Sequence, residues 1–413
     1  MSGRNFGSRL TLAAVTVLVT LLGVAWSSVT ASSRSNRAPR RLYVSSRGSN
    51  RAPCTHSRPC RSISHAVAVA HPGDEIDVAP GFYRERVTLT KRLTVRGSHL
   101  PIVDARGRGR GIAIRGARAA GSVVEGLVLQ HAAYEGVLAL GTKHVTIAHN
   151  VVRDDDRGLF AHRLTRECKA NGPPPPTNGV MDERAGGCGE AIHLASSSDS
   201  RVVDNLVTGN AGGIYLTDES GPAAHNLIVG NQVLANLYDC GITLASHSQH
   251  AVWSSGRPRP RVGGVYDNTI SGNVAERNGV VVPGAGILVA AAFSRGAAYG
   301  NRIIGNTVSG NGLPGVALHS HERPQDLNGN VIRNNVIGRN AIGGSRGGPG
   351  DGDGGIHHTA GILVWSASTK IAQIHVSGNR ISDNYFGIWT ENVPRLSRTA
   401  NHYRRVRVPL SQH

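Results

Sequence analysis

The chain has 413 residues, a formal net charge of +18 and only 4% aromatic residues. That length would suit two or three ordinary domains, while the few aromatics and the lack of any nucleic-acid-binding motif argue against a nucleic-acid partner. Only 4 of the 45 basic residues are lysine, so the charge has two open explanations: attraction to an acidic polysaccharide or cell-wall polymer, or arginine-rich codon usage.

The first 31 residues have the pattern of a secretory signal peptide. A basic segment precedes the apolar stretch 10–26, and Val29-Thr-Ala31 fits the small-residue cleavage site. Because the apolar stretch is shorter than the roughly 20 residues of a spanning helix, we expect a secreted or cell-envelope protein with no stable membrane span. An uncleaved anchor is the alternative. Residues 32–41 read as a Ser/Arg-rich linker.

Five cysteines in an exported protein suggest disulfides. Cys54 and Cys60 lie in a proline-flanked loop and are expected to pair. Cys168 and Cys188 bracket a proline-rich segment and are expected to staple its base. Cys240 would be left over, although sequence alone does not fix the connectivity.

Two short phrases recur along the rest of the chain. The phrase Asn-x-[Ile/Val/Leu]-x-x-Asn begins at Asn205, Asn226, Asn268, Asn301, Asn330 and Asn379. The phrase Gly-[Ile/Val]-x-[Leu/Val], with its last place relaxed in some copies, begins at Gly111, Gly136, Gly213, Gly241, Gly286, Gly315, Gly361 and Gly387. Repeats a few tens of residues apart indicate a solenoid, and β-branched triplets between Gly and Asn predict that strands form its coils.

The predicted organisation follows from these repeats. Residues 42–110 should form an N-terminal cap and the first coils, with a short helix near 62–70 covering the open end of the stack. Residues 111–395 should form the coils, and residues 396–413 a basic tail. Insertions interrupt the period at 163–190, 246–264 and 341–360. Since insertions on one face often mark the binding face, we expect a groove there.

The N-terminal motifs carry a family resemblance. The segment Pro59-Cys60-Arg-Ser-Ile-Ser-His-Ala, then Pro72-Gly-Asp-Glu-Ile-Asp-Val-Ala-Pro-Gly-Phe-Tyr83, followed by Asn-rich coils, resembles the right-handed parallel β-helix, or pectin-lyase-like, superfamily, which includes the accessory protein of nitrous-oxide reductase maturation. The resemblance covers about residues 42–395. It implies an all-β, right-handed single-stranded parallel β-helix solenoid with a short N-terminal capping helix. It implies no activity, because the Asp-Pro-His signature of mannuronan epimerases and the Gly-His-Gly and Asn-Thr-Asp motifs of polygalacturonases are absent.

Aligning the Gly-Ile-x-Leu strands predicts which side chains point outward. Phe160, His193 and Tyr215 should form an aromatic platform on consecutive coils, with Trp365 and Trp389 further along the same face. Such rings suit stacking on sugars. The alternative is that overlying loops bury them as a satellite core.

Glu219 and His247 should occupy equivalent positions on adjacent coils. A carboxylate beside an imidazole can fix its tautomer and raise its basicity, as a general base requires. Tyr215 or His193 would then be the proton donor. An ordinary surface ion pair is the alternative.

Metal sites are weaker predictions. His319 and His321 could chelate a metal only with a third ligand, for which His247 is the candidate. Asp154–Asp156 and Asp351-Gly-Asp353 could hold calcium as a cofactor, but neither segment has the full spacing of a calcium-binding loop, which favours solvated acidic turns.

These residues favour a polyuronate lyase or C5-epimerase, which abstracts the proton α to a carboxylate. His247 would be the base, oriented by Glu219, and an arginine would neutralise the substrate carboxylate. The remaining predicted substrate-binding residues are Phe160, Trp365, Trp389, Glu391, His319, His321, Arg163, Arg295 and Arg323. The alternative is a non-catalytic solenoid, glycan-binding, cell-surface or maturation-accessory in role. We expect a monomer.

Overall fold

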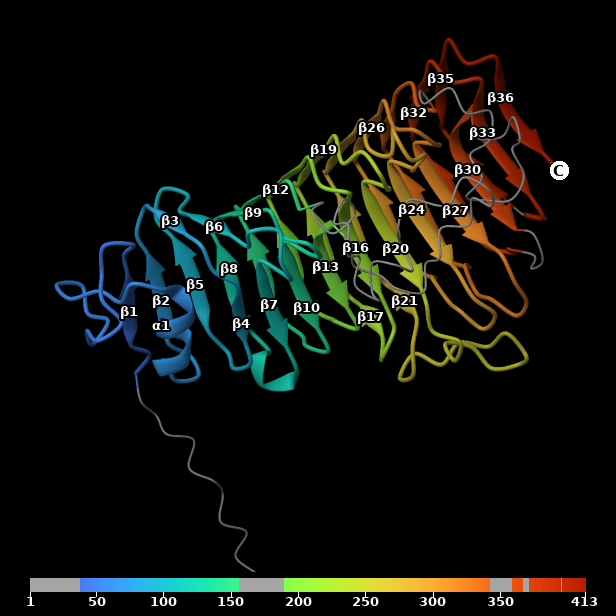
Figure 1. The fold of residues 1–413 in the computed structure, drawn as a ribbon. Helices are drawn as coiled ribbons and strands as arrows, with labels where there is room; N and C mark the ends of the chain where they lie inside the picture. Colours follow the sequence, from blue (N-terminus) through green and yellow to red (C-terminus); the bar gives the residue numbers. More distant parts are fainter. Residues whose placement is uncertain (1–37, 156–188, 342–358, 367–370, 395) are drawn as a thin grey trace, which may run out of the picture. The chain divides into compact units, whose positions relative to one another are not determined.

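The computed structural model describes residues 38–155, 189–341, 359–366, 371–394 and 396–413. The chain divides into two compact units, Met1–Ala38 and Pro39–His413. The predicted signal peptide and residues 32–37 of the predicted linker lie outside the described residues. The second unit is a right-handed parallel β-helix built from three long sheets (Figure 1).

Each coil contributes one strand to each sheet, and every strand pairs in parallel with its counterparts on neighbouring coils. Sheet A contains β1 (Arg41–Val44), β2 (Glu75–Val78), β5 (Thr94–Gly97), β8 (Val123–Glu125), β11 (Thr146–Ala148), β14 (Arg201–Val203), β18 (Leu227–Val229), β22 (Thr269–Ser271), β25 (Arg302–Ile304), β28 (Asn330–Arg333), β31 (Ile374–Ser377) and β34 (Leu396–Thr399). Sheet B contains β3 (Phe82–Tyr83), β6 (Ile102–Asp104), β9 (Val128–Gln130), β12 (Val151–Arg153), β15 (Leu206–Thr208), β19 (Gln232–Leu234), β23 (Val274–Glu276), β26 (Thr307–Ser309), β29 (Val336–Ile337), β32 (Arg380–Ser382) and β35 (His402–Arg404).

Sheet C holds the Gly-Ile-x-Leu strands. It contains β4 (Val87–Leu89), β7 (Ile112–Arg115), β10 (Val137–Leu140), β13 (Glu190–Ala195), β16 (Gly212–Thr217), β20 (Ile242–Ser246), β24 (Ile287–Ala291), β27 (Val316–Ser320), β30 (Ala360–Ser366), β33 (Phe386–Glu391) and β36 (Val408–Gln412). A short 3-10 turn, Ala117–Ala119, follows β7, and β17 (Ala223–Ala224) pairs with β21 (Val265–Tyr266) beside the main sheets.

The core is a set of aliphatic ladders inside the coils. On sheet C, Ile214, Ile242 and Ile287 occupy one inward column and are at most 1% exposed. Because successive side chains of a strand point to opposite faces, the residues between them point outward. Burial of each Ile, Val or Leu side chain stabilises the folded state by roughly 1.5–3 kcal/mol relative to exposure, and the stacked coils bury many of them.

Asparagine side chains form three columns at the corners of the coils. In the first, the Oδ1 of every asparagine after Asn150 accepts a hydrogen bond from the backbone N–H of the asparagine on the preceding coil: Asn150, Asn205, Asn231, Asn273, Asn306, Asn335, Asn379 and Asn401. The second runs from Ser200 through Asn226, Asn268, Asn301 and Asn330. The third runs from Asp155 through Asn210, Asn236, Asn278, Asn311, Asn340 and Asn384. These columns satisfy corner N–H groups that the sheets leave unbonded.

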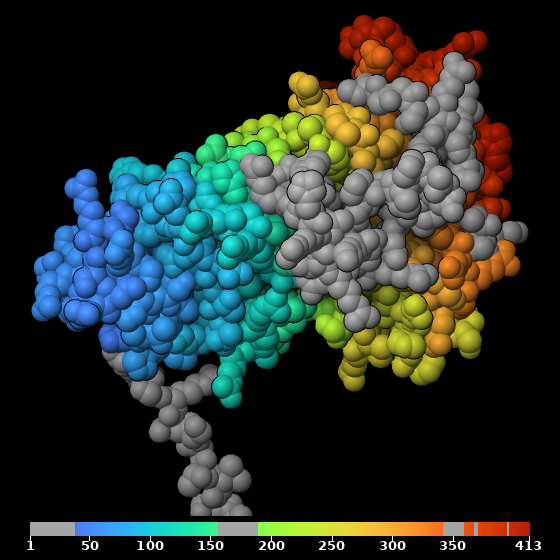
Figure 2. All heavy atoms as spheres, in the orientation of Figure 1, coloured from blue at the N-terminus to red at the C-terminus, as the bar shows by residue number. Residues whose placement is uncertain are grey.

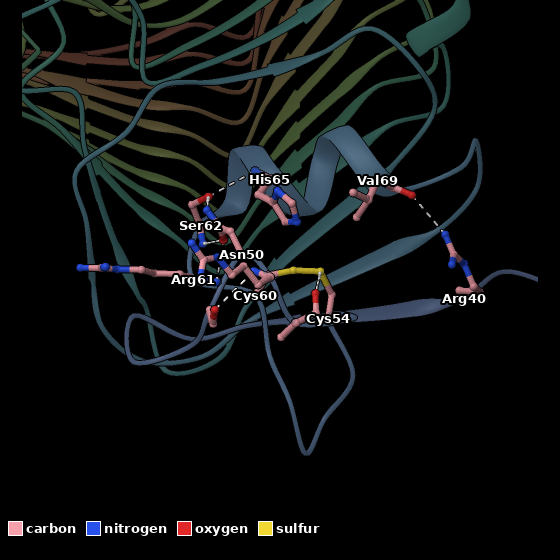
Figure 3. The surroundings of a disulfide bond; sticks show 11 residues. Arg40, Asn50, Cys54, Cys60, Arg61, Ser62, His65 and Val69 are labelled. Atoms are coloured by element: carbon pink, nitrogen blue, oxygen red, sulfur yellow. Dashed lines mark hydrogen bonds between the residues drawn. A yellow bond between two sulfur atoms is a disulfide. The ribbon is translucent and has the colours of Figure 1, made fainter.

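The N-terminal end is closed by helix α1 (Ile63–Val69), as predicted. Its Ile63, Ala66 and Val67 are buried against the first coils. Figure 3 shows the predicted Cys54–Cys60 disulfide beside this helix, with the Asn50 amide holding the chain that leads into it. The cap therefore combines apolar packing with one covalent link.

Two features differ from the predicted organisation. Residues 396–413 contain β34, β35 and β36, which add a further coil to all three sheets, so the basic C-terminal segment is part of the solenoid. In sheet C, β10 pairs directly with β13, so no coil intervenes where Phe160 was expected. No helix among the described residues has the length and apolarity needed to cross a membrane.

Candidate active site

The outward positions of sheet C follow the predicted register over seven coils. His193 pairs with Tyr215, Tyr215 with Thr243, and the column continues through Leu288, Ala317, Leu363 and Trp389. Before His193, however, the column holds Leu138. Leu138 therefore occupies the position before His193 that was expected for Phe160, and Phe160 itself lies outside the described residues.

Tyr215, His247 and Glu219 form a hydrogen-bonded chain at the end of this face. The Tyr215 hydroxyl lies 3.0 Å from His247 Nε2, and His247 Nδ1 lies 3.1 Å from Glu219 Oε1. The His247 ring also meets Phe293 edge-on, with centroids 6.1 Å apart. The predicted juxtaposition of Glu219 and His247 is thus present, with the tyrosine in direct contact.

A second chain joins Glu219 to His193. Thr217 donates to Glu219 Oε2 over 2.5 Å, and His193 Nε2 lies 2.8 Å from the Thr217 hydroxyl oxygen. His193 Nδ1 lies 3.5 Å from Glu135 Oε1. The His193 and Tyr215 rings stack, with centroids 5.0 Å apart. The side chains of Glu135, His193, Thr217, Glu219, His247 and Tyr215 therefore form one continuous network.

The network fixes the direction of each hydrogen bond. A charged carboxylate only accepts, so Glu219 requires His247 to carry its proton on Nδ1 and leaves Nε2 as the acceptor of the Tyr215 proton. Thr217 gives its proton to Glu219, so its oxygen accepts from His193 Nε2–H. This assignment rests on the bonding pattern. It leaves His247 Nε2 as a basic nitrogen facing a phenol.

Charges in the network are set by burial and by these partners. Burial opposes the charged form of Glu219, but His247, the charge of His193 and the Thr217 hydroxyl outweigh it and lower the Glu219 pKa to about 2. Burial likewise opposes protonation of His193, but Glu135 and Glu219 outweigh it and raise the His193 pKa. The side chains of His193 and Tyr215 are almost wholly buried, whereas 36% of the Glu219 side chain is exposed.

Sequence reasoning missed an acidic cluster at the start of the same strands. By the register of β10 and β13, Glu135 faces Glu190 on the next coil, and the side chains of Glu190 and Asp239 flank Gly212. Burial, reinforced by Asp239 and Glu135 against the opposing charge of His193, raises the Glu190 pKa to about 7. The available signal was an acidic residue two or three positions before the first inward-facing residue of three strands, namely Val137, Ile192 and Ile242.

Asp218 contacts the backbone of His247 and not its ring. Its Oδ1 accepts from the backbone N–H groups of His247 and Ser248, at 2.6 and 3.0 Å. Its other oxygen accepts from Ser246 and from Gly264. Asp218 thereby holds both ends of the 246–264 insertion and positions the His247 backbone.

The predicted residues further along sheet C form a separate aromatic group. His319 lies 5.7 Å from His321 and 5.9 Å from Trp365, centroid to centroid. Glu391 sits beside Trp365 in register. Trp389 is buried, stacks on His413 and joins an apolar cluster, as the satellite-core alternative expected.

The predicted arginines are only partly placed. Arg295 donates from Nε to the Val252 carbonyl in the insertion, and Arg323 is exposed before Pro324. Arg163, Cys168 and Cys188 lie outside the described residues, so the second disulfide stays a prediction. Cys240 is buried, and its sulfur accepts a hydrogen bond from the Ala285 N–H.

The described residues give little support to a metal. Among them, a ligand-like group of three occurs only at Cys54, Cys60 and His65, and its two sulfurs are joined in the disulfide. The expected trio of His247, His319 and His321 does not form such a group. Asp155 begins an asparagine column and accepts from the Ala132 N–H at 2.6 Å, so it serves the fold. Asp351 and Asp353 lie outside the described residues.

Comparison with known proteins finds one matching family and solved structures that share the fold. The DUF1565 family, described as a protein of unknown function, matches residues 46–282. No curated protein matches the chain. The A-module of mannuronan C-5 epimerase AlgE4 from Azotobacter vinelandii superposes with a TM-score of 0.54 at 14% identity, over 85% of this chain and 93% of that one. The Dettilon tailspike protein superposes with a TM-score of 0.50 at 13% identity, over 83% of this chain and 63% of that one. At these identities the likeness concerns the fold alone.

Proposed function

The chain belongs to the DUF1565 family, whose function is unknown, and we propose that it is a secreted, carbohydrate-active β-helix protein that abstracts the proton α to the carboxylate of a polyuronate. The product would be an unsaturated sugar for a lyase or an inverted one for a C5-epimerase. The observation that carries the proposal is the Glu219–His247–Tyr215 chain. It supplies a basic nitrogen, its orienting carboxylate and a phenol within hydrogen-bonding distance.

The proposed cycle begins when His247 Nε2 takes the C5 proton. The electron pair of the broken C–H bond moves into the carboxylate-stabilised enolate, and Glu219 holds the resulting imidazolium at Nδ1. In a lyase, the C4–O bond then breaks as the C4–C5 double bond forms, and the Tyr215 hydroxyl protonates the departing oxygen. In an epimerase, the Tyr215 hydroxyl instead delivers its proton to the opposite face of C5, which leaves the Tyr215 phenolate.

The hydrogen bond between the two residues completes the cycle. The Tyr215 phenolate recovers a proton from the His247 imidazolium 3.0 Å away, so both groups return to their starting states. In this proposal Arg163, Arg295 or Arg323 neutralises the substrate carboxylate, and Phe160, Trp365, Glu391, His319 and His321 contact the chain. The AlgE4 A-module shares the fold, which supports the view that such a coil stack can carry this chemistry.

The test is incubation with a panel of polyuronates in heavy water, with and without Ca²⁺. Ultraviolet absorbance from an unsaturated uronate would establish a lyase. Deuterium uptake at C5 without absorbance would establish an epimerase. Absence of both signals on every polymer, with the polymer nonetheless bound, would contradict the catalytic proposal.

One observation favours a second candidate, a non-catalytic glycan-binding solenoid. His193, Tyr215 and His247 are each at most 9% exposed, as in a structural polar network. In that case Glu219→Gln and His247→Ala would bind every polymer as the parent does, and no variant would change a reaction rate.

A further inference from the structure

The first coils of sheet C carry a groove that the proposed chemistry does not use. Its volume is about 780 Å³. Six arginines line it: Arg84, Arg86, Arg106, Arg108, Arg110 and Arg115. Two acidic residues, Glu85 and Asp104, complete the charged lining. The groove lies over β4 and β7, on the coils next to the N-terminal cap (Figure 1) and within the blue-to-cyan surface of Figure 2.

Both carboxylates are already bonded to other groups. Glu85 accepts from the backbone N–H groups of Ile63 and Ser64 at the start of helix α1, each at 2.8 Å. Asp104 accepts from Gln130 at 2.9 Å and His131 at 2.8 Å. Both carboxylates therefore hydrogen-bond to groups other than the groove arginine side chains.

Most of the groove arginines, in contrast, have no carboxylate of the described residues as an ion-pair partner. Within the described part of the chain, only Arg110 of the six forms an ion pair, with Glu135. Arg110 also lies over the Tyr134 ring, at 4.9 Å. Four further arginines of the lining are exposed, and among the described residues none of them forms an ion pair: Arg84, Arg86, Arg106 and Arg108. Like charges this close repel one another, so the arrangement favours a ligand that brings several negative charges.

The groove and the candidate active site share one column of side chains. Thr88 and Ala113 line the groove, and their column continues through Leu138 to His193 and Tyr215. Adjacent strands are about 4.8 Å apart, so Ala113 lies roughly 10 Å from His193 along the sheet. Arg110 links the two regions directly, because its partner Glu135 is also the partner of His193.

We infer that this arginine groove is a subsite that binds consecutive carboxylate-bearing sugars of an acidic polysaccharide, a few residues away from the sugar at His247. An extended chain lying across the coils would occupy both regions. The placement of the polysaccharide chain along sheet C rests on the proposed function. The preference for a polyanionic glycan rests only on the arginines of the groove. Bidentate guanidinium contacts suit carboxylates.

The experiment measures binding separately from turnover. Fluorescence anisotropy would follow labelled oligouronates of two lengths, short and long, with the Tyr215→Phe change present throughout to suppress any reaction. The test variant is Arg86→Gln/Arg108→Gln/Arg115→Gln. The matched control is Arg302→Gln/Arg380→Gln/Arg201→Gln, which removes the same charge from exposed positions on sheets A and B. A single Arg108→Gln variant guards against misfolding of the triple variant.

We expect the groove variant to weaken binding of the long oligouronate by roughly 10-fold, because three exposed ion pairs are lost, and to flatten its salt dependence. The control variant should bind as the parent does, replacement by lysine should restore part of the affinity, and a neutral glucan should not bind. Equal affinity of groove and control variants would overturn the inference, as would equally tight binding of DNA of the same charge or no binding of any oligouronate. If the groove variant loses binding while the parent catalyses no reaction, the result would support the binding groove and contradict the proposed catalytic function.

Discussion

The hydroxyl of Tyr215 lies 3.0 Å from Nε2 of His247. The two residues are separated by 32 positions in sequence and meet because Tyr215 lies within β16 while His247 directly follows β20, the next strand of sheet C. Glu219 fixes the opposite nitrogen of the imidazole. The pair has the arrangement required of a base and an acid that exchange one proton.

Removal of the Tyr215 hydroxyl should separate chemistry from folding. We expect Tyr215→Phe to slow C5 exchange or elimination by roughly 100-fold, the lower range for a positioned acid or base, with the melting temperature little changed because the ring still stacks on His193. The matched control is Tyr299→Phe, which removes a phenol packed on Tyr266. Equal losses in the two variants would show that the hydroxyl has no catalytic role.

The buried carboxyl of Glu190 should make stability depend on pH. The folded protein retains this proton up to about pH 7, whereas the unfolded chain releases it near 4.5, so the free energy of unfolding should fall as the pH rises through that window. The difference corresponds to about 3 kcal/mol. Glu190→Gln should remove this decline in melts at pH 5, 7 and 9. The control is Glu276→Gln on sheet B, and a decline that persists in Glu190→Gln would contradict the assignment.

The asparagine columns should be essential to the stack. Asn273 accepts from the Asn231 backbone and side chain and donates to the Ile228 carbonyl and to Asn306. Asn273→Ala leaves several of these buried groups unbonded, at about 1–3 kcal/mol each. We therefore expect a loss of more than 2 kcal/mol in urea unfolding. The exposed Gln232→Ala should cost less than about 0.5 kcal/mol, and a similar cost for both would mean that water replaces the column.

The disulfide should stabilise the N-terminal cap. Cys54 and Cys60 close a loop with a sequence separation of 6, for which chain entropy predicts about 2 kcal/mol. The double variant Cys54→Ser/Cys60→Ser should lower the unfolding free energy by that amount. Addition of a reductant should have the same effect on the parent and none on the variant. A mass of the intact parent that shows two free thiols at these positions would rule out the bond.

The sequence predicted most of the fold because its repeats are local. The Gly-Ile-x-Leu phrase marks one strand per coil, and the register inferred from it holds from His193 to Trp389. The asparagine phrase was less transparent, since its two asparagines serve different corners: Asn205 belongs to the first column and Asn210 to the third. Spacing alone does not distinguish corners of similar length.

The candidate site was predicted only in its outward residues. Glu219, His247 and Tyr215 could be brought together by counting along the strands. Glu135 could not, because its contact with His193 crosses the long insertion between β12 and β13, where the repeat is interrupted. The same interruption explains why Leu138, and not a residue after β12, precedes His193 in the outward column.

The most direct measurement is deuterium uptake at C5 of the responding polyuronate by the parent, His247→Ala and Glu219→Gln, compared under conditions in which all three proteins are folded and saturated with polymer. The account predicts uptake by the parent, a loss of roughly 100-fold or more in His247→Ala and a smaller loss in Glu219→Gln, which keeps a hydrogen-bonding group but not the charge. Uptake at the parental rate by both variants would contradict it.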